Sequence, residues 1–172
     1  MNELGEISVC YAVRFERRSR HSPARLWRAI TEADEVAKWM GFPARIDLRP
    51  GGEYVLDFDT LHPGDKLEGV ILRVEPERLL RYAVDTSVVE WSIEPDADGC
   101  RHVFGQTGLP PRENEEELIA GWHDGLDSLD QYLDGVARTW ADSRRLWAEL
   151  KIRYRPLLAE ALGDAYLVGG PK

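Results

Sequence analysis

The chain has 172 residues, of which 43% are hydrophobic and 31% are charged, and its formal net charge is −9. These values are typical of one globular domain, or of one domain with an extension, and they exclude a chain that is disordered throughout. The negative charge disfavours binding to nucleic acid, because the chain and a phosphate backbone repel each other.

Cysteine usage and the apolar segments restrict the compartment and the cofactors. The two cysteines, Cys10 and Cys100, are too few for a disulfide framework. No His/Cys spacing predicts a metal site, and no motif predicts a cofactor. The first residues do not resemble a signal peptide, and no apolar run reaches the roughly 18 residues that a membrane span needs. We therefore expect a cytoplasmic protein without a membrane span.

The N-terminal part predicts one strand followed by two short helices. Apolar and polar residues alternate from Ile7 to Arg17, which is typical of a half-buried strand. Ser22 and Pro23 favour the start of a helix, because serine caps a helix and proline fits its first turn. Thr31 is expected to cap a second helix that ends near Trp39.

The middle of the chain predicts an antiparallel meander, since short alternating segments are separated by turns that contain Pro and Gly. Arg49-Pro50-Gly51-Gly52 is one such turn. In the third segment, Val70, Leu72 and Val74 are expected to share one face. The predicted strands are 44–48, 53–59, 67–75, 79–85, 88–94 and 101–107.

Two helical segments complete the chain. Three glutamates at 115–117 favour a helix start, and an apolar stripe through Trp122 and Leu126 continues until Gly135, which favours a helix end. A second apolar stripe follows, with a kink or break expected before Pro156. These patterns divide the chain into a domain at 1–135 and a C-terminal helical extension at 136–172, packed on the domain or on a second subunit.

Several local motifs occur in the order found in one known family. The segment Ser22–Thr31, the Arg49–Gly52 turn, the segment Gly69–Leu79 and the Gly121-Trp122 pair resemble the family of activator of heat-shock-protein ATPase homologues, in the START-like (SRPBCC) superfamily. The resemblance covers about residues 8 to 134. It implies an α+β helix-grip fold, in which a curved antiparallel sheet of six to seven strands wraps around a long C-terminal helix. It also implies a space between sheet and helix in which relatives bind small molecules.

The candidate site consists of side chains expected to face that space. The aromatic candidates are Trp39, Phe58, Tyr82, Trp91, Phe104 and Trp122. The polar candidates are His102 and Gln106, which share the parity of Phe104, together with Arg73 and His123. These residues either line a ligand cavity or fill the core, and both alternatives stay open. Gly121 is expected to allow the long helix to approach the sheet closely.

The leading hypothesis is a START-like protein that binds a small apolar or aromatic ligand. One alternative is a cyclase-like or hydrolase-like enzyme that uses His102 as a general acid or base, although no catalytic motif is present and no catalytic residue is assigned. The other is a protein-interaction module. Its homodimer surface would use the second stripe, Trp140, Trp147, Leu150 and Tyr154.

Overall fold

The computed structural model describes residues 10–59, 63–110, 115–136 and 139–163, except for the side chains of residues 140 and 141. Residues 7–9 of the first predicted strand and the side chain of Trp140 therefore lie outside the described residues. The strands are β1 (Tyr11–Ser19), β2 (Ala44–Ile46), β3 (Glu53–Asp57), β4 (Lys66–Glu75), β5 (Leu79–Val84), β6 (Ser87–Asp96) and β7 (Gly99–Leu109). The helices are α1 (Pro23–Thr31), α2 (Ala33–Met40), α3 (Glu115–Leu133) and α4 (Trp140–Leu162).

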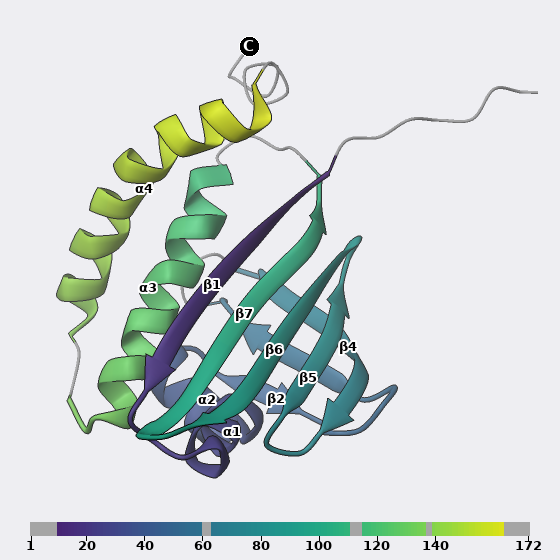
Figure 1. Ribbon diagram of the computed structural model, residues 1–172. Coiled ribbons are helices and arrows are strands. Elements are labelled where there is room, and N and C mark those ends of the chain that lie inside the picture. The colour runs from purple at the N-terminus through teal and green to yellow at the C-terminus, as the bar shows by residue number, and fades with distance from the viewer. Residues whose placement is uncertain (1–9, 60–62, 111–114, 137–138, 164–172) are drawn as a thin grey trace, which may run out of the picture.

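The seven strands form one antiparallel sheet in the order β1-β7-β6-β5-β4-β3-β2. Strands β2 to β7 form a meander, and the first strand pairs with the last. Helices α1 and α2 follow β1 and lie at one end of the sheet, while α3 and α4 lie side by side along it (Figure 1). The fold is the predicted α+β helix-grip fold, with the long α3 packed on a curved sheet.

The two short helices begin as their sequences require, with one correction. The Ser22 hydroxyl accepts a hydrogen bond of 3.2 Å from the Arg25 backbone N–H, and Pro23 occupies the first turn of α1. Thr31 does not cap α2, because α1 continues through it and its hydroxyl donates to the Trp27 carbonyl at 2.7 Å. Glu32 takes the N-cap position of α2 without a side-chain hydrogen bond.

A β-bulge in β4 overturns the predicted faces of that strand. Ile71 pairs with Tyr82 and Arg73 with Arg81, so Leu72 has no opposite residue. The extra residue reverses the alternation, which places Ile71 and Val74 against the core. Val70 and Leu72 are exposed by 53% and 47%, so the expectation that they share a face with Val74 is wrong.

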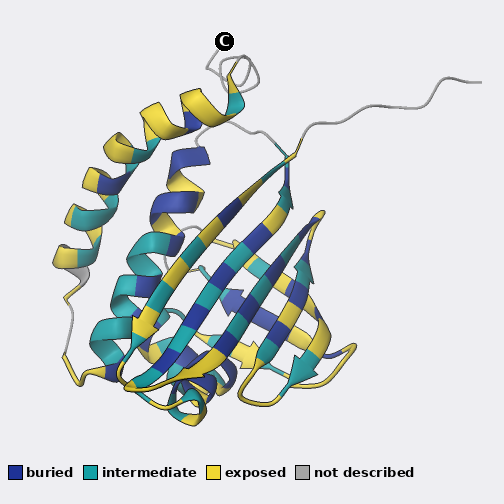
Figure 2. Ribbon diagram, viewed as in Figure 1, coloured by how far each residue is buried: buried dark blue, intermediate teal, exposed yellow. Residues whose placement is uncertain are grey.

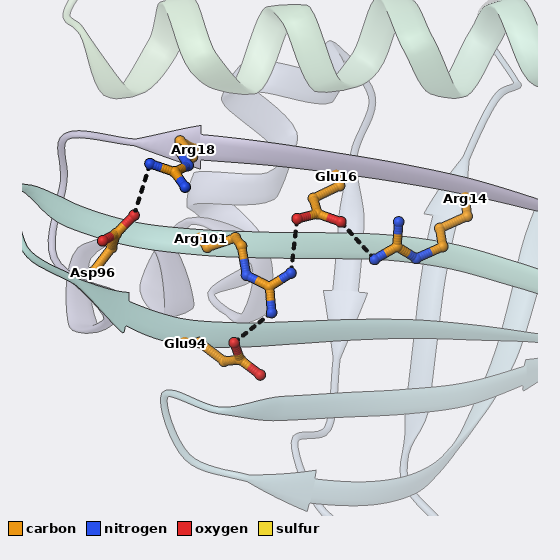
Figure 3. A network of polar contacts seen from close by, with 6 residues as sticks. All are labelled: Arg14, Glu16, Arg18, Glu94, Asp96 and Arg101. Atoms are coloured by element: carbon orange, nitrogen blue, oxygen red, sulfur yellow. Dashed lines mark hydrogen bonds and ion pairs between the residues drawn. The ribbon is translucent and has the colours of Figure 1, made fainter.

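The two faces of the sheet differ in burial, as the alternating buried and partly buried residues along β6 and β7 show (Figure 2). The inner face of β7 carries Cys100, His102, Phe104 and Gln106, all buried. On the outer face, Arg101 forms ion pairs with Glu16 at 2.7 Å and Glu94 at 2.5 Å, joining three strands (Figure 3). The outer face is therefore a solvated ionic surface, and the core lies on the helix side.

Helix α3 ends at the predicted glycine and packs on the sheet through its apolar stripe. The Gly135 N–H bonds to the Tyr132 carbonyl at 3.1 Å and the Val136 N–H to the Gln131 carbonyl at 2.8 Å, the pattern of a Schellman cap. The expected role of Gly121 is wrong: it is exposed, and a methyl group there would meet open space. Gly125 faces α2 rather than the sheet, and a Cβ there would make ordinary contacts with Met40 and Trp39 at 3.5 and 3.6 Å.

Helix α4 runs antiparallel to α3 and covers it on the side away from the sheet centre. Arg155 pairs with Glu116 at 3.0 Å and Lys151 with Glu117 at 3.1 Å. Leu158 joins a small apolar cluster with Val13, Leu109 and Ile119. The helix is not broken at Pro156 but continues through it, and Figure 1 shows it bending toward its C-terminal end. In the described part of the chain, no helix is long and apolar enough to cross a membrane.

Candidate ligand-binding site between the sheet and α3

Four of the six aromatic candidates form a continuous row through the interior. Trp39 of α2 meets Trp91 of β6 edge to face, with ring centroids 6.5 Å apart. Trp91 then meets Phe104 of β7 at 4.9 Å, and Phe104 meets Trp122 of α3 at 4.4 Å. The row therefore links both sides of the interior, from the short helices to α3.

Tyr82 and Phe58 belong to two separate aromatic pairs. Tyr82 stacks on Tyr54 with ring centroids 4.4 Å apart, and burial raises the pKa values of both phenols. Phe58 lies just beyond β3, half-buried, with its ring 4.9 Å from that of Phe42. Tyr54 was absent from the predicted site, although its shared parity with Phe58 on the predicted strand was a usable signal.

A buried chain of hydrogen bonds connects α3 with β7 and the β5–β6 turn. The Trp122 indole nitrogen donates to the Gln106 side-chain oxygen at 2.8 Å. The Gln106 amide nitrogen donates to the Ser87 hydroxyl at 2.8 Å, and that hydroxyl donates to the Val84 carbonyl at 2.9 Å. Both ends of the Gln106 amide are thus satisfied inside the core. Ser87 was not predicted, because its position at the start of β6 resembles that of an ordinary turn residue.

Trp91 and His102 have polar nitrogen atoms that are buried without well-aligned partners. Within the described residues, both ring nitrogens of His102 make no hydrogen bond, and Trp91 Nε1 makes no well-aligned one, although it lies near enough to the Tyr82 hydroxyl to act on that phenol. The two rings lie nearly parallel, with an interplanar angle of 26° and centroids 6.2 Å apart. Trp39 differs, since its indole nitrogen donates to the Ala29 carbonyl at 2.8 Å. Poorly satisfied polar atoms therefore gather around Trp91 and His102.

The imidazole of His102 is held in its neutral form. Burial is the main cause that lowers its pKa. The negative charge of Asp130 raises the pKa by a smaller amount, and the positive charge of Arg17 lowers it. Arg17 lies opposite His102 on β1 and forms ion pairs of 2.6 Å with Asp127 and 2.7 Å with Asp130. These ion pairs bridge the edge of the sheet to α3 beside His102. A neutral imidazole offers one hydrogen-bond donor and one acceptor.

Arg73 and His123 do not join this interior site. The bulge at Leu72 turns Arg73 to the outer face, where it forms an ion pair with Glu75. His123 points toward α4, and its Nδ1 lies 2.7 Å from the Tyr154 hydroxyl. Strand parity suggested an inward Arg73, and proximity to Trp122 suggested an inward His123. Both expectations were wrong, because the sequence shows neither the bulge nor the side from which α4 packs.

The Trp122 side chain is packed into the interior beneath α3. Its indole is 7% exposed and rests against Phe104, which is fully buried. Two hollows in the described surface lie elsewhere, one of about 330 Å³ between α3 and α4 and one of about 160 Å³ where β1 ends beside the β6–β7 turn. A ligand that enters beneath α3 would meet the Trp122 side chain, which covers Phe104.

The architecture and its aromatic interior define a START-like helix-grip protein. Residues 20–134 match the family model described as Activator of Hsp90 ATPase homolog 1-like protein. That match spans most of the domain, and the chain belongs to this family. Among curated proteins, none matches the chain.

Several solved structures share the fold. Protein MLL2253 from Mesorhizobium loti is 25% identical with a TM-score of 0.65, and the match covers 74% of this chain and 100% of that chain. CalU16 from Micromonospora echinospora is 23% identical with a TM-score of 0.68, and the match covers 87% of this chain and 89% of that chain. EF2215 from Enterococcus faecalis, a conserved protein of unknown function, is 20% identical with a TM-score of 0.68, covering 85% of each chain.

Proposed function

We propose that this protein binds a small, mostly apolar molecule that carries one neutral hydrogen-bonding group, held between the sheet and α3. The observation that carries the proposal is the presence of two unpaired ring nitrogens on His102, beside the weakly bonded Trp91 indole, in an otherwise apolar interior. Each such buried group costs about 1–3 kcal/mol when it has no partner. A bound hydroxyl group, which can accept from Trp91 and donate to one nitrogen of His102, would offset part of that cost.

The chemistry of the two side chains restricts the ligand. Trp91 Nε1 can only donate, whereas neutral His102 can donate through one nitrogen and accept through the other. A phenol or an aromatic alcohol satisfies both side chains at once. A carboxylate is disfavoured, because an ion loses its hydration in this apolar interior. The proposed contacts are Trp39, Phe58, Tyr82, Trp91, His102, Phe104, Gln106 and Trp122, with Phe58 and Tyr82 reached only by larger ligands.

Access to this site requires a conformational change of α3 or of one side chain. Trp122 covers Phe104 and is held by Gln106. Rotation of the indole away from Phe104 would open space beside the unpaired nitrogens, at the cost of one buried hydrogen bond. Such a minor conformation becomes populated when a ligand stabilises it.

A thermal-shift and native mass spectrometry screen with small phenols and aromatic alcohols tests the proposal. We expect compounds that bind the wild type to raise its Tm in a concentration-dependent manner. His102→Leu keeps the core apolar and is expected to remain folded without responding to the same compounds. The matched control is His21→Gln, since His21 bonds to Asp134 outside the interior and its variant keeps the response. If no compound stabilises the wild type, or if His102→Leu responds equally, the proposal fails.

General acid–base catalysis in the same space is a second candidate, and the buried neutral imidazole of His102 favours it. A catalytic histidine commonly has an oriented ring, held by a hydrogen bond to a carboxylate or carbonyl. No such bond to His102 is present in the described part of the chain, which is why binding is the preferred function. Mass spectrometry of retained compounds after long incubation distinguishes the two: conversion in the wild type and none in His102→Gln would indicate catalysis.

A further inference from the structure

A second hollow, separate from the interior site, lies between α3 and α4. Its volume is about 330 Å³ and it is lined by His123, Leu150, Arg153, Tyr154, Pro156 and Leu157. All of these residues except His123 lie on α4, beyond the segment that matches the family model. This hollow, called the α4 groove below, is therefore a feature of the C-terminal extension.

The floor of the α4 groove is an ordered polar pair. His123 Nδ1 lies 2.7 Å from the Tyr154 hydroxyl, and the two rings meet edge to face at 5.9 Å. On the other side of the imidazole, Asp127 lies 3.7 Å from Nε2 and forms an ion pair of 2.6 Å with Arg17. The charge of Asp127 is partly offset by Arg17, which also pairs with Asp130, and the Tyr154 hydroxyl is held by His123.

The rim of the groove combines a cation with apolar surface. Arg153 is exposed, and among the described residues no carboxylate lies within ion-pair distance of it. Its neighbours Lys151 and Arg155 differ, since both pair with glutamates of α3. Leu157 is 56% exposed, while Leu150 is buried beneath it. A cation beside an apolar wall is complementary to an amphipathic anion.

We propose that the α4 groove binds a small amphipathic carboxylate, with its head on Arg153 and the Tyr154 hydroxyl and its apolar part on Leu150, Pro156 and Leu157. This inference does not depend on the proposed function, because the interior site prefers an uncharged ligand and lies on the other side of α3. The carboxylate would supply the partner that Arg153 lacks. The apolar part would cover Leu157, which the fold leaves exposed.

Chemical-shift titration of the ¹⁵N-labelled full chain tests the proposal with two probes that differ only in the head group, 4-phenylbutyrate and 4-phenylbutan-1-ol. We expect saturable shifts at the backbone amides of residues 150–155, 157 and 123 with the carboxylate. Loss of one charge-assisted contact corresponds to roughly tenfold in affinity, so the alcohol is expected to bind about tenfold more weakly.

Three variants sharpen the result. Arg153→Gln is expected to weaken binding of the carboxylate by about tenfold and to leave the affinity for the alcohol unchanged. Tyr154→Phe, which keeps the ring, is expected to weaken the carboxylate by a smaller factor. Arg144→Gln is the control, since Arg144 is an exposed arginine of the same helix that does not line the groove, and it is expected to bind as the wild type.

The alternatives give different spectra, and each would overturn the proposal. Equal affinity for both probes would mean that the groove does not recognise charge. Carboxylate-induced shifts at Trp91 and His102 in place of α4 would assign the probe to the interior. Concentration-dependent shifts of α4 without any probe would identify a second copy of the chain as the occupant.

Discussion

The Trp122 indole nitrogen donates a 2.8 Å hydrogen bond to the Gln106 side-chain oxygen, and this bond joins α3 to β7 inside the core. Gln106 also donates to Ser87, so one amide connects a helix, a strand and a turn. The position of α3 over the inner face of the sheet therefore depends on polar contacts as well as on its apolar stripe. The same bond restrains the side chain that would have to move if a ligand entered.

Gln106→Leu is expected to destabilise the protein by about 2 kcal/mol, because the Trp122 N–H loses its partner while both side chains stay buried. Urea unfolding measures this change. Trp122→Phe combined with Gln106→Leu is expected to cost less than the sum of the two single variants, since the unpaired indole is then absent. Strict additivity would show that the hydrogen bond does not contribute to stability.

Stability is expected to fall as the pH falls below 6.5, partly because of His102. Burial lowers the pKa of His102 below its ordinary value of 6.5 in the folded protein, whereas the unfolded chain takes up a proton near 6.5. Protonation therefore favours unfolding between the two values, and the contribution of His102 to stability is complete only above the unfolded-state pKa. Urea titrations from pH 5 to 8 give the slope of the unfolding free energy against pH for the wild type and for His102→Leu.

His123 requires its own comparison in that experiment, because burial lowers its pKa as well. We expect His102→Leu and His123→Gln each to flatten part of the pH dependence. We also expect His102→Leu to be more stable than the wild type at every pH, since it removes two unpaired buried nitrogens. A steeper slope in His102→Leu than in the wild type would contradict the assignment.

The sequence predicted the architecture well, because its signals are local and independent of one another. Alternation along β7 correctly placed His102, Phe104 and Gln106 on one buried face. Alternation failed in β4, where a single unpaired residue at Leu72 reversed the face of Arg73. A bulge depends on the pairing of two strands, and neither strand alone reveals it.

The sequence predicted which of the candidate side chains are buried, but not how these side chains contact one another. Trp39, Trp91, Phe104 and Trp122 were all expected inside, and they are. Parity cannot show that Trp122 pairs with Gln106 or that His102 lacks a partner, because those facts depend on side-chain geometry between distant elements. The partner of Gln106, Ser87, lies nineteen residues away in the chain.

Arg17 is expected to contribute more to the stability of the fold than the arginines of the outer sheet face do. Its side chain is 18% exposed and holds both Asp127 and Asp130, whereas Arg14 is 59% exposed and holds one glutamate. Arg17→Met is expected to cost about 1–2 kcal/mol, and Arg14→Met less than about 0.5 kcal/mol, because exposed ion pairs contribute little. Urea unfolding at low salt compares them.

Arg17→Met also has a spectroscopic consequence at His102. Burial is the main cause of the low pKa of His102, and the positive charge of Arg17 lowers it further, while Asp130 raises it. Removing Arg17 takes away a lowering charge and leaves Asp130 without its partner, so the pKa of His102 is expected to rise. If an NMR titration of the imidazole protons shows no rise in the pKa of His102, Arg17 does not influence the interior site electrostatically.

The packing of α4 on its own chain can be tested by truncating a buried and an exposed aliphatic side chain of that helix. Leu158 is 4% exposed in the cluster with Val13, Leu109 and Ile119, whereas Ile152 is 68% exposed. Leu158→Ala is expected to cost about 2 kcal/mol, and Ile152→Ala less than about 0.5 kcal/mol. Equal effects in urea unfolding would mean that α4 does not pack as described.

The same helix decides the oligomeric state, for which a homodimer through Trp147, Leu150 and Tyr154 remains the competing proposal. Leu150 is buried, Tyr154 bonds to His123, and the Trp147 indole donates to the Glu117 carbonyl at 3.3 Å, all within one chain. We therefore expect light scattering to give the mass of one chain. Removal of all residues after Gly135 would uncover Val13 and Ile119, so the shortened chain is expected to be less stable and to aggregate. A full-length mass of two chains that falls to one in Trp147→Ala would instead establish the dimer.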